Sequence, residues 1–227
     1  MTTRPESHSG KHTLTLAAQA LNQAAERIGD DFNKAVRLLG TSAGKIVVTG
    51  VGKSAHIAAK IAATLNSTGS SAMFLHAGEA LHGDLGAVQP GDVVVCLSKS
   101  GRSDEVTQLL PSLAQRSCPL VALTADPESP LGMAASVVLD VSVPEEACPL
   151  DLAPTTSTTL QLAMGDALAV ALMAASAFQA KDFAANHPAG SLGKKLTWTL
   201  ASLVDPARKP AVPWHASLAD VLEAMSE

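Results

Sequence analysis

Aromatic residues are scarce in this chain: they make up 3% of its 227 residues, and tyrosine is absent. Proteins that bind single-stranded nucleic acid stack bases on aromatic side chains, so the composition disfavours that class. The formal net charge is −5 with no basic block to offset it, which argues against nucleic-acid partners in general. A small anion remains compatible, because it responds to local hydrogen-bond donors rather than to net charge.

Cysteines are also few, and Cys96, Cys118 and Cys148 lie far apart without a C-x-x-C pair. This pattern disfavours a disulfide framework or a zinc site and suits a reducing, cytoplasmic location. Residues 1–16 lack the apolar core of a signal peptide. The best candidate for a membrane span, residues 160–180, contains Gly165 and Asp166 and is more typical of a buried helix. We therefore expect no membrane partner.

What the chain does have is a series of short apolar runs separated by segments with helical spacing. Hydrophobic residues make up 47% and charged residues 16%, which is typical of a globular protein. We expect strands near residues 45–49, 71–75, 93–97, 120–124 and 136–143. Their alternation with helices predicts the α/β class: a doubly wound, flavodoxin-like, five-stranded parallel sheet flanked by helices.

Before and after the predicted sheet, the chain is expected to form helices and flexible segments. Residues 1–11 are polar and predicted to be a flexible N-terminus, and residues 12–39 predict two helices interrupted at 29–31. Residues 158–179 predict a long helix that is apolar nearly all round and therefore buried. Residues 12–205 would form the main domain. Residues 206–227 are expected to be a linker and the start of a second domain that the chain does not complete.

The most informative segment is a serine-rich turn between the third strand and the next helix. It contains Ser98, Ser100, Gly101 and Ser103. Hydroxyl groups, the free N–H groups of a helix N-terminus and the helix dipole favour a bound anion, and a phosphate is the natural ligand. The alternative is a common serine-rich turn in which Ser103 merely caps its helix.

Other loops are expected at the same edge of the sheet. Ligands of parallel sheets bind beyond the carboxyl ends of the strands, near the switch in strand order, so residues 50–54, 76–84 and 98–103 should converge, joined by 144–157. Residues 50–54 do not form a Walker A loop, because Val47 stands where that motif needs glycine. A dinucleotide site lacks its ribose-binding acid, because the second strand ends in His76.

Several side chains near this edge could carry chemistry. Lys53 could pair with a phosphate or an oxyanion, or it could simply be a solvated lysine in the first turn of a helix. The segment with His76, Glu79, His82 and Asp84 could bind a metal, but it lacks the usual helical ligand spacings and is more simply a turn with satisfied polar groups.

Carboxylates crowd the same region. Glu105 lies in a first helical turn, where the helix dipole stabilises it whether or not it acts as an acid or base. Glu145, Glu146 and Asp151 lie in one loop, and they would repel a phosphate unless at least one transfers protons. The hydroxyl residues 155–157 could add to the phosphate site or cap the long helix.

Six segments together resemble the D-arabinose 5-phosphate isomerases, a family of sugar isomerase (SIS) domain proteins. The resemblance covers residues 12–205, and its segments are Gly50-Val-Gly-Lys-Ser54, His76-Ala-Gly-Glu-Ala-Leu-His-Gly-Asp-Leu-Gly86, Ser98-Lys-Ser-Gly101, Glu146-Ala-Cys-Pro-Leu150, Leu152-Ala-Pro-Thr-Thr-Ser157 and His187-Pro-Ala-Gly190. It implies an enzyme that interconverts D-ribulose 5-phosphate and D-arabinose 5-phosphate through an enediol, without a cofactor. It further implies a supply of Kdo for lipopolysaccharide, a homotetramer, and a pair of CBS domains after residue 213.

The resemblance also implies roles for individual residues. The catalytic set would be Lys53, His82, Glu105, Glu146 and His187, with His187 serving a neighbouring subunit's site. The phosphate-binding set would be Gly52, Ser54, Ser98, Ser100, Ser103, Thr155, Thr156 and Ser157. No metal would be required, although His76 and His82 could form an inhibitory site.

Two other functions use the same fold. One is a non-catalytic phosphosugar sensor that controls a partner, and the other is an isomerase of a different sugar phosphate. A sensor would need the serine turn but not the carboxylates and histidines around it, which favours an enzyme. Lys99 and Arg102 depart from the family pattern by adding positive charge beside the serine turn.

Overall fold

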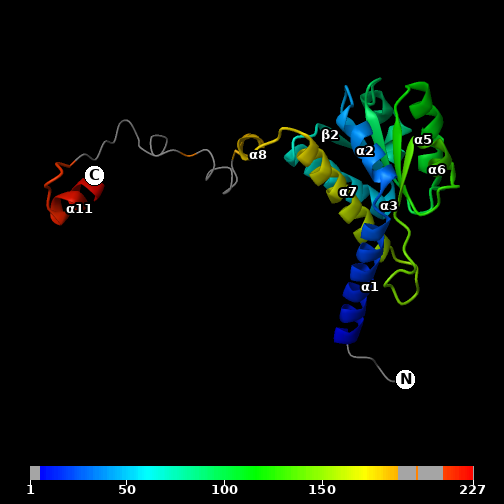
Figure 1. Cartoon of the computed structure of the whole chain (residues 1–227), viewed down its shortest axis with the longest axis horizontal. Helices are drawn as coiled ribbons and strands as arrows, with labels where there is room; N and C mark the ends of the chain where they lie inside the picture. The colour runs from blue at the N-terminus through cyan, green and yellow to red at the C-terminus, as the bar shows by residue number, and fades with distance from the viewer. Residues whose placement is uncertain (1–5, 189–197, 199–211, 227) are drawn as a thin grey trace. The chain divides into compact units, whose positions relative to one another are not determined.

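The computed structural model describes residues 6–188, 198 and 212–226 (Figure 1). The chain divides into two compact units, residues 1–179 and 180–227. The first unit contains the parallel sheet and every loop that follows one of its strands. The predicted main domain over residues 12–205 and the assignment of residues 206–227 to a linker and a second domain stay predictions.

The sheet has five parallel strands in the order β2-β1-β3-β4-β5. Their bounds are Ile46–Gly50 (β1), Ala72–His76 (β2), Val93–Leu97 (β3), Leu120–Thr124 (β4) and Val137–Asp140 (β5). Every residue of β1, β3 and β4 is buried, as expected for apolar strands covered on both faces. The predicted flavodoxin-like, doubly wound α/β fold is confirmed.

Helices cover both faces of this sheet (Figure 1). One face packs against α2 (Asp30–Gly40), α3 (Gly52–Ser67) and α7 (Thr156–Ala175). The other packs against α4 (Ala77–Ala80), α5 (Asp104–Gln115) and α6 (Pro130–Ala134). Along β3 the side chains alternate, so that Val93 and Val95 enter the first core while Val94 and Cys96 enter the second. A short 3₁₀ helix, Asp84–Ala87, follows α4.

The structure corrects two expectations about the ends of this unit. Helix α1 (Glu6–Arg27) begins at Glu6, so the prediction of a flexible segment over residues 1–11 is wrong for residues 6–11. Helix α7 is buried along one face only, and Val170 on its other side is 56% exposed. By length and composition α7 could cross a membrane, but its buried face is that of a core helix, which passes the same test.

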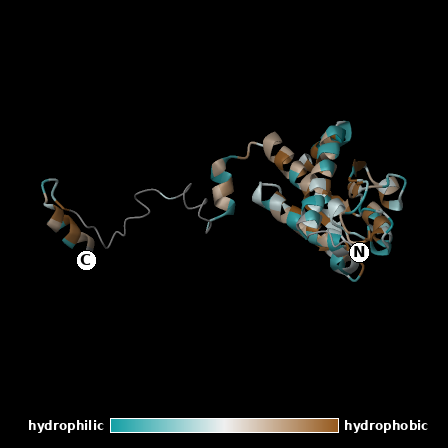
Figure 2. Cartoon of the chain, turned by 90° about the horizontal axis from the view of Figure 1, so that it is seen from below, coloured by the Kyte–Doolittle hydropathy of each residue, from teal (hydrophilic) through white to brown (hydrophobic). Residues whose placement is uncertain are grey.

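The second unit contains α8 (Ala180–Asn186) and α11 (Leu218–Ser226) among its described residues. Helix α11 lies within residues 206–227, and its hydrophobic residues are brown in Figure 2. The end of the predicted main domain and the start of the predicted linker, residues 199–211, lie outside the described residues.

Candidate active site

A cavity of about 510 Å³ opens beyond the carboxyl ends of β1 and β3. From these neighbouring strands the chain leaves in opposite directions, β1 connecting to β2 and β3 to β4, which makes this the switch point of the sheet. The cavity is lined by Val51, Lys53, Ser54, Leu97, Ser98, Lys99, Ser100, Arg102, Ser103, Ala125, Asp126 and Pro154. Residues 50–54 and 98–103 therefore do converge as predicted, and the predicted segment 144–157 joins them through Pro154.

The turn between β1 and α3 places a cation and a hydroxyl at the cavity. Gly52 has a φ of +58°, a left-handed conformation that favours glycine. Lys53 is exposed at the start of α3, while the Ser54 hydroxyl donates to Oε1 of Gln161 at 3.1 Å. Because Gln161 is buried in α7, this hydrogen bond fixes the turn against the long helix.

The serine turn is held by its own hydrogen bonds. The Ser98 hydroxyl accepts from the Gly101 N–H at 3.1 Å and lies 3.2 Å from the Ser103 hydroxyl. Ser103 is the N-cap residue of α5, but its side chain makes no capping hydrogen bond. The interpretation of Ser103 as no more than a helix cap is therefore wrong, because its hydroxyl faces Ser98 at the cavity instead of the helix N–H groups.

The charge on the cavity wall is mostly positive. Lys53, Lys99 and Arg102 line it together with one carboxylate, Asp126. Arg102 donates to Asp126 at 2.8 Å, and this hydrogen bond holds the pKa of Asp126 below its ordinary value. Three cations, four serine hydroxyls and the first turn of α5 form a suitable environment for a doubly charged anion such as a phosphate monoester.

Glu146 lies in the wall behind this cavity. Its side chain is 3% exposed, and its Oε1 accepts from Nζ of Lys99 at 2.7 Å. Its Oε2 accepts from the backbone N–H groups of Thr155 at 2.8 Å and Ser157 at 3.1 Å, at the N-terminus of α7. Burial by itself raises the pKa of Glu146, but the hydrogen bonds from Lys99, Ser157 and Thr155 outweigh burial and lower that pKa to about 2. Glu146 is therefore a carboxylate at neutral pH.

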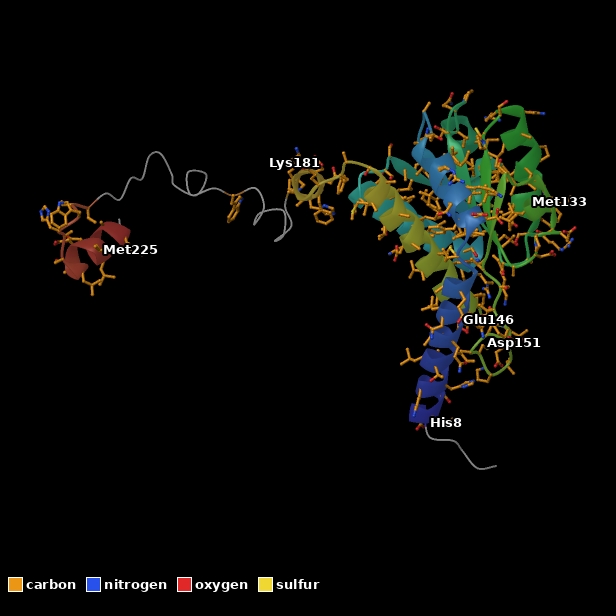
Figure 3. All side chains as sticks on the ribbon, viewed as in Figure 1. His8, Met133, Glu146, Asp151, Lys181 and Met225 are labelled. Atoms are coloured by element: carbon orange, nitrogen blue, oxygen red, sulfur yellow. The ribbon has the colours of Figure 1, made fainter. Side chains whose placement is uncertain are left out.

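A second cavity of about 510 Å³ lies on the other side of Glu146. It is formed by α1, through His8 and His12, and by the loop with Glu145, Cys148 and Asp151. In Figure 3 the labelled Glu146 and Asp151 lie on this loop beside α1, whose first turn carries the labelled His8. Glu146 is thus reached from two cavities, directly from this one and through Lys99 from the first.

Comparison with known proteins identifies the family. Residues 41–171 match the SIS domain. Arabinose 5-phosphate isomerase GutQ of Escherichia coli K12 is 49% identical over 220 residues, which are 97% of this chain and 68% of that protein. The corresponding KdsD of Pseudomonas aeruginosa PAO1 is 51% identical over 189 residues, 83% of this chain and 58% of that protein. This chain belongs to the SIS-domain arabinose 5-phosphate isomerase family.

A solved structure supports the same assignment. The protein c3406 of E. coli CFT073, in complex with A5P, superposes on this chain with a TM-score of 0.78 and is 37% identical. The match covers 82% of this chain and 100% of that one. The family resemblance inferred from the six sequence segments is therefore confirmed.

Not every residue implied by the family lies at the first cavity. Thr155, Thr156 and Ser157 are absent from its lining, although the adjacent Pro154 is present. The N–H groups of Thr155 and Ser157 are occupied by Glu146, and the Thr155 hydroxyl accepts from the Ala147 N–H at 2.9 Å. The Thr156 hydroxyl is buried without a hydrogen-bond partner in the structure. These contacts fit positioning of Glu146 better than direct phosphate binding.

The loop after β2 forms a separate cavity of about 550 Å³ lined by His76, Glu79 and Asp84, among others. The Gly78 N–H donates to Nδ1 of His76 at 3.2 Å, so the imidazole caps α4. His82 is exposed and is not part of this lining. Among the described residues no group of three or more His, Cys, Asp or Glu side chains is arranged to hold a metal ion. Because this loop lines a separate cavity, the prediction that it converges with the loops of the first cavity is wrong.

Glu105 and His187 are two further members of the predicted catalytic set. Glu105 is half-buried in the first turn of α5 and does not line the first cavity. His187 lies in the second unit, where its ring stacks on Phe183 with centroids 4.0 Å apart. Its Nδ1 lies 2.8 Å from the Phe183 carbonyl oxygen. Their catalytic roles stay predictions.

Sequence reasoning missed Asp126 and Gln161 as residues of the site. Asp126 follows the end of β4 almost directly, so the rule that ligands bind beyond the carboxyl ends of strands could have indicated it. Gln161 is a buried amide in a largely apolar helix, which is a signal for a specific hydrogen-bond partner. Ser54 supplies that partner.

Proposed function

We propose that this protein interconverts D-ribulose 5-phosphate and D-arabinose 5-phosphate through an enediol. The observation that carries the proposal is the cavity at the switch point, in which serine hydroxyls and cations lie next to a buried, ionised carboxylate. A phosphate site explains the hydroxyls and cations, and proton transfer explains the carboxylate. Membership of the arabinose 5-phosphate isomerase family supports the choice of a pentose phosphate.

The reaction needs a base, an acid and a group that stabilises the developing oxyanion, and it needs no cofactor. In the proposed mechanism Ser98, Ser100 and Ser103 hold the phosphate with the N-terminal N–H groups of α5 and fix the orientation of the sugar. Lys53 stabilises the enediolate oxygen.

The remaining members of the predicted catalytic set transfer protons in the proposed mechanism. Glu146 or Glu105 removes the proton next to the carbonyl carbon and returns it to the adjacent carbon. His187 or His82 opens the sugar ring or transfers the hydroxyl proton. Neither carboxylate lines the first cavity, but Glu146 is the better supported, because it accepts a hydrogen bond from Lys99 of the cavity wall.

The test is incubation of the protein with D-ribulose 5-phosphate, followed by chromatographic or NMR detection of D-arabinose 5-phosphate. Hexulose and heptose phosphates are run in parallel, and the Ser100→Ala variant serves to link turnover to the serine turn. Formation of arabinose 5-phosphate from the pentose alone supports the proposal. Turnover of another sugar phosphate would favour an isomerase of different specificity, and binding without turnover would favour a phosphosugar sensor.

The proposal extends to the compartment, the assembly and the metabolic role of the enzyme. Free cysteines in the described part of the chain, Cys96, Cys118 and Cys148, fit a cytoplasmic enzyme. The exposed apolar side of α7 around Val170 fits self-association, for which we propose a homotetramer, to be checked by sedimentation. We also propose that the product supplies Kdo for lipopolysaccharide, and that α11 begins a CBS domain.

A further inference from the structure

Lys99 and Glu146 form an ion pair that joins the two cavities. Lys99 lines the first cavity, where we place the phosphate, and Glu146 lines the second. The lysine side chain is 42% exposed and the carboxylate 3% exposed. The two residues are 47 positions apart in the chain, yet Nζ donates to Oε1 at 2.7 Å. One partner is therefore accessible to a ligand and the other is almost completely shielded.

In this arrangement Glu146 is a poor base. Oε1 accepts from Lys99, and Oε2 accepts from the N–H groups of Thr155 and Ser157, so protonation would sacrifice one or more of these hydrogen bonds. Other titratable groups around it line the second cavity. They are His8 and His12 from α1, and Glu145, Cys148 and Asp151 from its own loop.

Among the described residues Lys99 is the donor to Oε1, whereas the donors to Oε2 all come from the start of α7. They are the N–H groups of Thr155 and Ser157, which the helix fixes, and the Thr155 hydroxyl at 3.3 Å. Lys99 instead carries its ammonium on a flexible four-carbon chain and has three N–H donors, of which one contacts Glu146. Its other donors are available to an anion in the first cavity, which Lys53 and Arg102 also line.

We propose that Lys99 is a positioning residue that links occupation of the first cavity to the basicity of Glu146, an inference that rests on the proposed function. A phosphate dianion in the cavity draws the Lys99 ammonium toward itself and frees Oε1. Oε1 then accepts the proton from the substrate carbon next to the carbonyl. The C–H electron pair becomes the enediolate double bond and the carbonyl electron pair moves onto oxygen. The hydroxyl proton of the deprotonated carbon then passes to that oxygen, Glu146 returns its proton to the former carbonyl carbon, and the new carbonyl forms at the carbon that lost its proton. The base is thus active chiefly when substrate is present.

The coupling works in both directions. If a bound dianion raises the proton affinity of Glu146, then protonation of Glu146 must strengthen dianion binding by the same factor. Sulfate is a suitable probe, because its charge does not change over the mildly acidic range in which carboxylates titrate. We expect sulfate binding to be accompanied by proton uptake. The association constant of sulfate should rise as the pH falls. The rise should be up to about tenfold for each unit by which sulfate raises the pKa of Glu146.

The experiment measures sulfate binding to the whole chain by calorimetry at several mildly acidic pH values, in buffers of different ionisation enthalpy. Wild type is compared with Lys99→Met, Lys99→Arg and Glu146→Gln. We expect proton uptake in wild type and in Lys99→Arg, which keeps the charge. Uptake should be much smaller in Lys99→Met and in Glu146→Gln. Equal uptake in wild type and Glu146→Gln, or in wild type and Lys99→Met, would overturn the proposal.

A matched control separates this coupling from a general effect on folding. Lys45 donates to the buried carboxylate of Asp92 at 2.9 Å, and neither residue lines the first cavity. Lys45→Met therefore removes a comparable ion pair and should retain the wild-type proton uptake, provided that circular dichroism shows each variant to be folded. The isomerase assay is independent of this measurement. Turnover without proton uptake would refute the coupling alone, and uptake without turnover would refute the isomerase alone.

Discussion

Gly101 and Ser129 lie so close together that a side chain at position 101 would overlap the Ser129 hydroxyl. A Cβ on Gly101 would also lie 2.6 Å from Cβ of Ser129 and 3.0 Å from Oγ1 of Thr124. Gly101 has a φ of +63°, and its carbonyl accepts from the Leu131 N–H at 3.2 Å. The serine turn is therefore packed directly against the start of α6, and this packing determines where its hydroxyls lie.

Replacement of Gly101 by alanine should disturb both stability and anion binding. The left-handed backbone and the overlap with Ser129 together should lower the free energy of unfolding by about 2 kcal/mol or more. Urea unfolding measures this loss, and calorimetry with sulfate measures the weaker binding. Gly52→Ala is the matched control, because Gly52 also has a positive φ, of +58°, but a Cβ there meets nothing within 4 Å. Equal losses in the two variants would contradict the role of the Ser129 contact.

The Glu146→Gln and Glu105→Gln variants should separate the two candidate bases. A general base contributes roughly a hundredfold to ten-thousandfold in rate, so we expect Glu146→Gln to lower kcat by that factor. Neither carboxylate lines the first cavity, but Glu146 is hydrogen-bonded to Lys99 of its wall, so Glu105→Gln should have a smaller effect. Steady-state kinetics with ribulose 5-phosphate measures both. A larger loss in Glu105→Gln would exchange the two assignments, and full turnover in both variants would refute them.

Stability should fall in acid through Glu146. Its pKa is about 2 in the folded protein against an ordinary value of 4.5, because hydrogen bonds from Lys99, Ser157 and Thr155 outweigh burial. Between these values the unfolded chain binds more protons than the folded chain, so the free energy of unfolding decreases as the pH is lowered through this window. Urea unfolding at a series of pH values measures the slope. Glu146→Gln should make the slope shallower, and an unchanged slope would contradict the assignment.

Asp92 should contribute to acid stability in the same direction. Burial raises its pKa, but hydrogen bonds from Gln89 and Lys45 outweigh burial, so the pKa lies below its ordinary value. Its stabilising contribution is therefore present above the pKa of the unfolded chain and is lost as the pH falls. Asp92→Asn, measured in the same unfolding series, should reduce the pH dependence. It should leave sulfate binding intact, because Asp92 does not line the first cavity.

The three cysteines should react with iodoacetamide at different rates. The N–H groups of Ala153, Leu152 and Leu150 lower the pKa of Cys148, whereas burial raises the pKa of Cys118 and raises that of Cys96 to about 12. Because the thiolate is the reactive form, Cys148 should be alkylated first near neutral pH. Mass spectrometry of a time course checks the order. Faster labelling of Cys96 or Cys118 in the folded protein would contradict it.

The strands were predictable because each is a continuous apolar run. A strand covered on both faces must be apolar along its whole length, and the predicted position of β4 agrees with the structure at both ends. The predicted range of 136–143 for the last strand is too long, since β5 ends at Asp140. Val141 and Val143 still pack against the core after the strand pairing has ended, so their hydrophobic character did not distinguish core contact from strand pairing.

The candidate site was predictable only in part. Residues 50–54 and 98–103 follow adjacent strands, so the rule for parallel sheets placed them together. The same rule placed residues 76–84 at that edge, but β2 lies on the far side of β1 from β3 and its loop forms another cavity. The Lys99–Glu146 pair joins residues 47 positions apart and has no local sequence signal. An amide in the apolar helix α7 indicates that Gln161 needs a partner, but not that the partner is Ser54.

The sequence by itself determined the fold class, the serine turn and the family, because each is encoded in residues adjacent in the chain: apolar runs, glycine and hydroxyl clusters, and short motifs. Tertiary structure alone decided that Glu146 is held by Lys99 and by the first turn of α7. A carboxylate's pKa and basicity depend on burial and on donors brought from distant positions, and those donors meet only when the chain has folded.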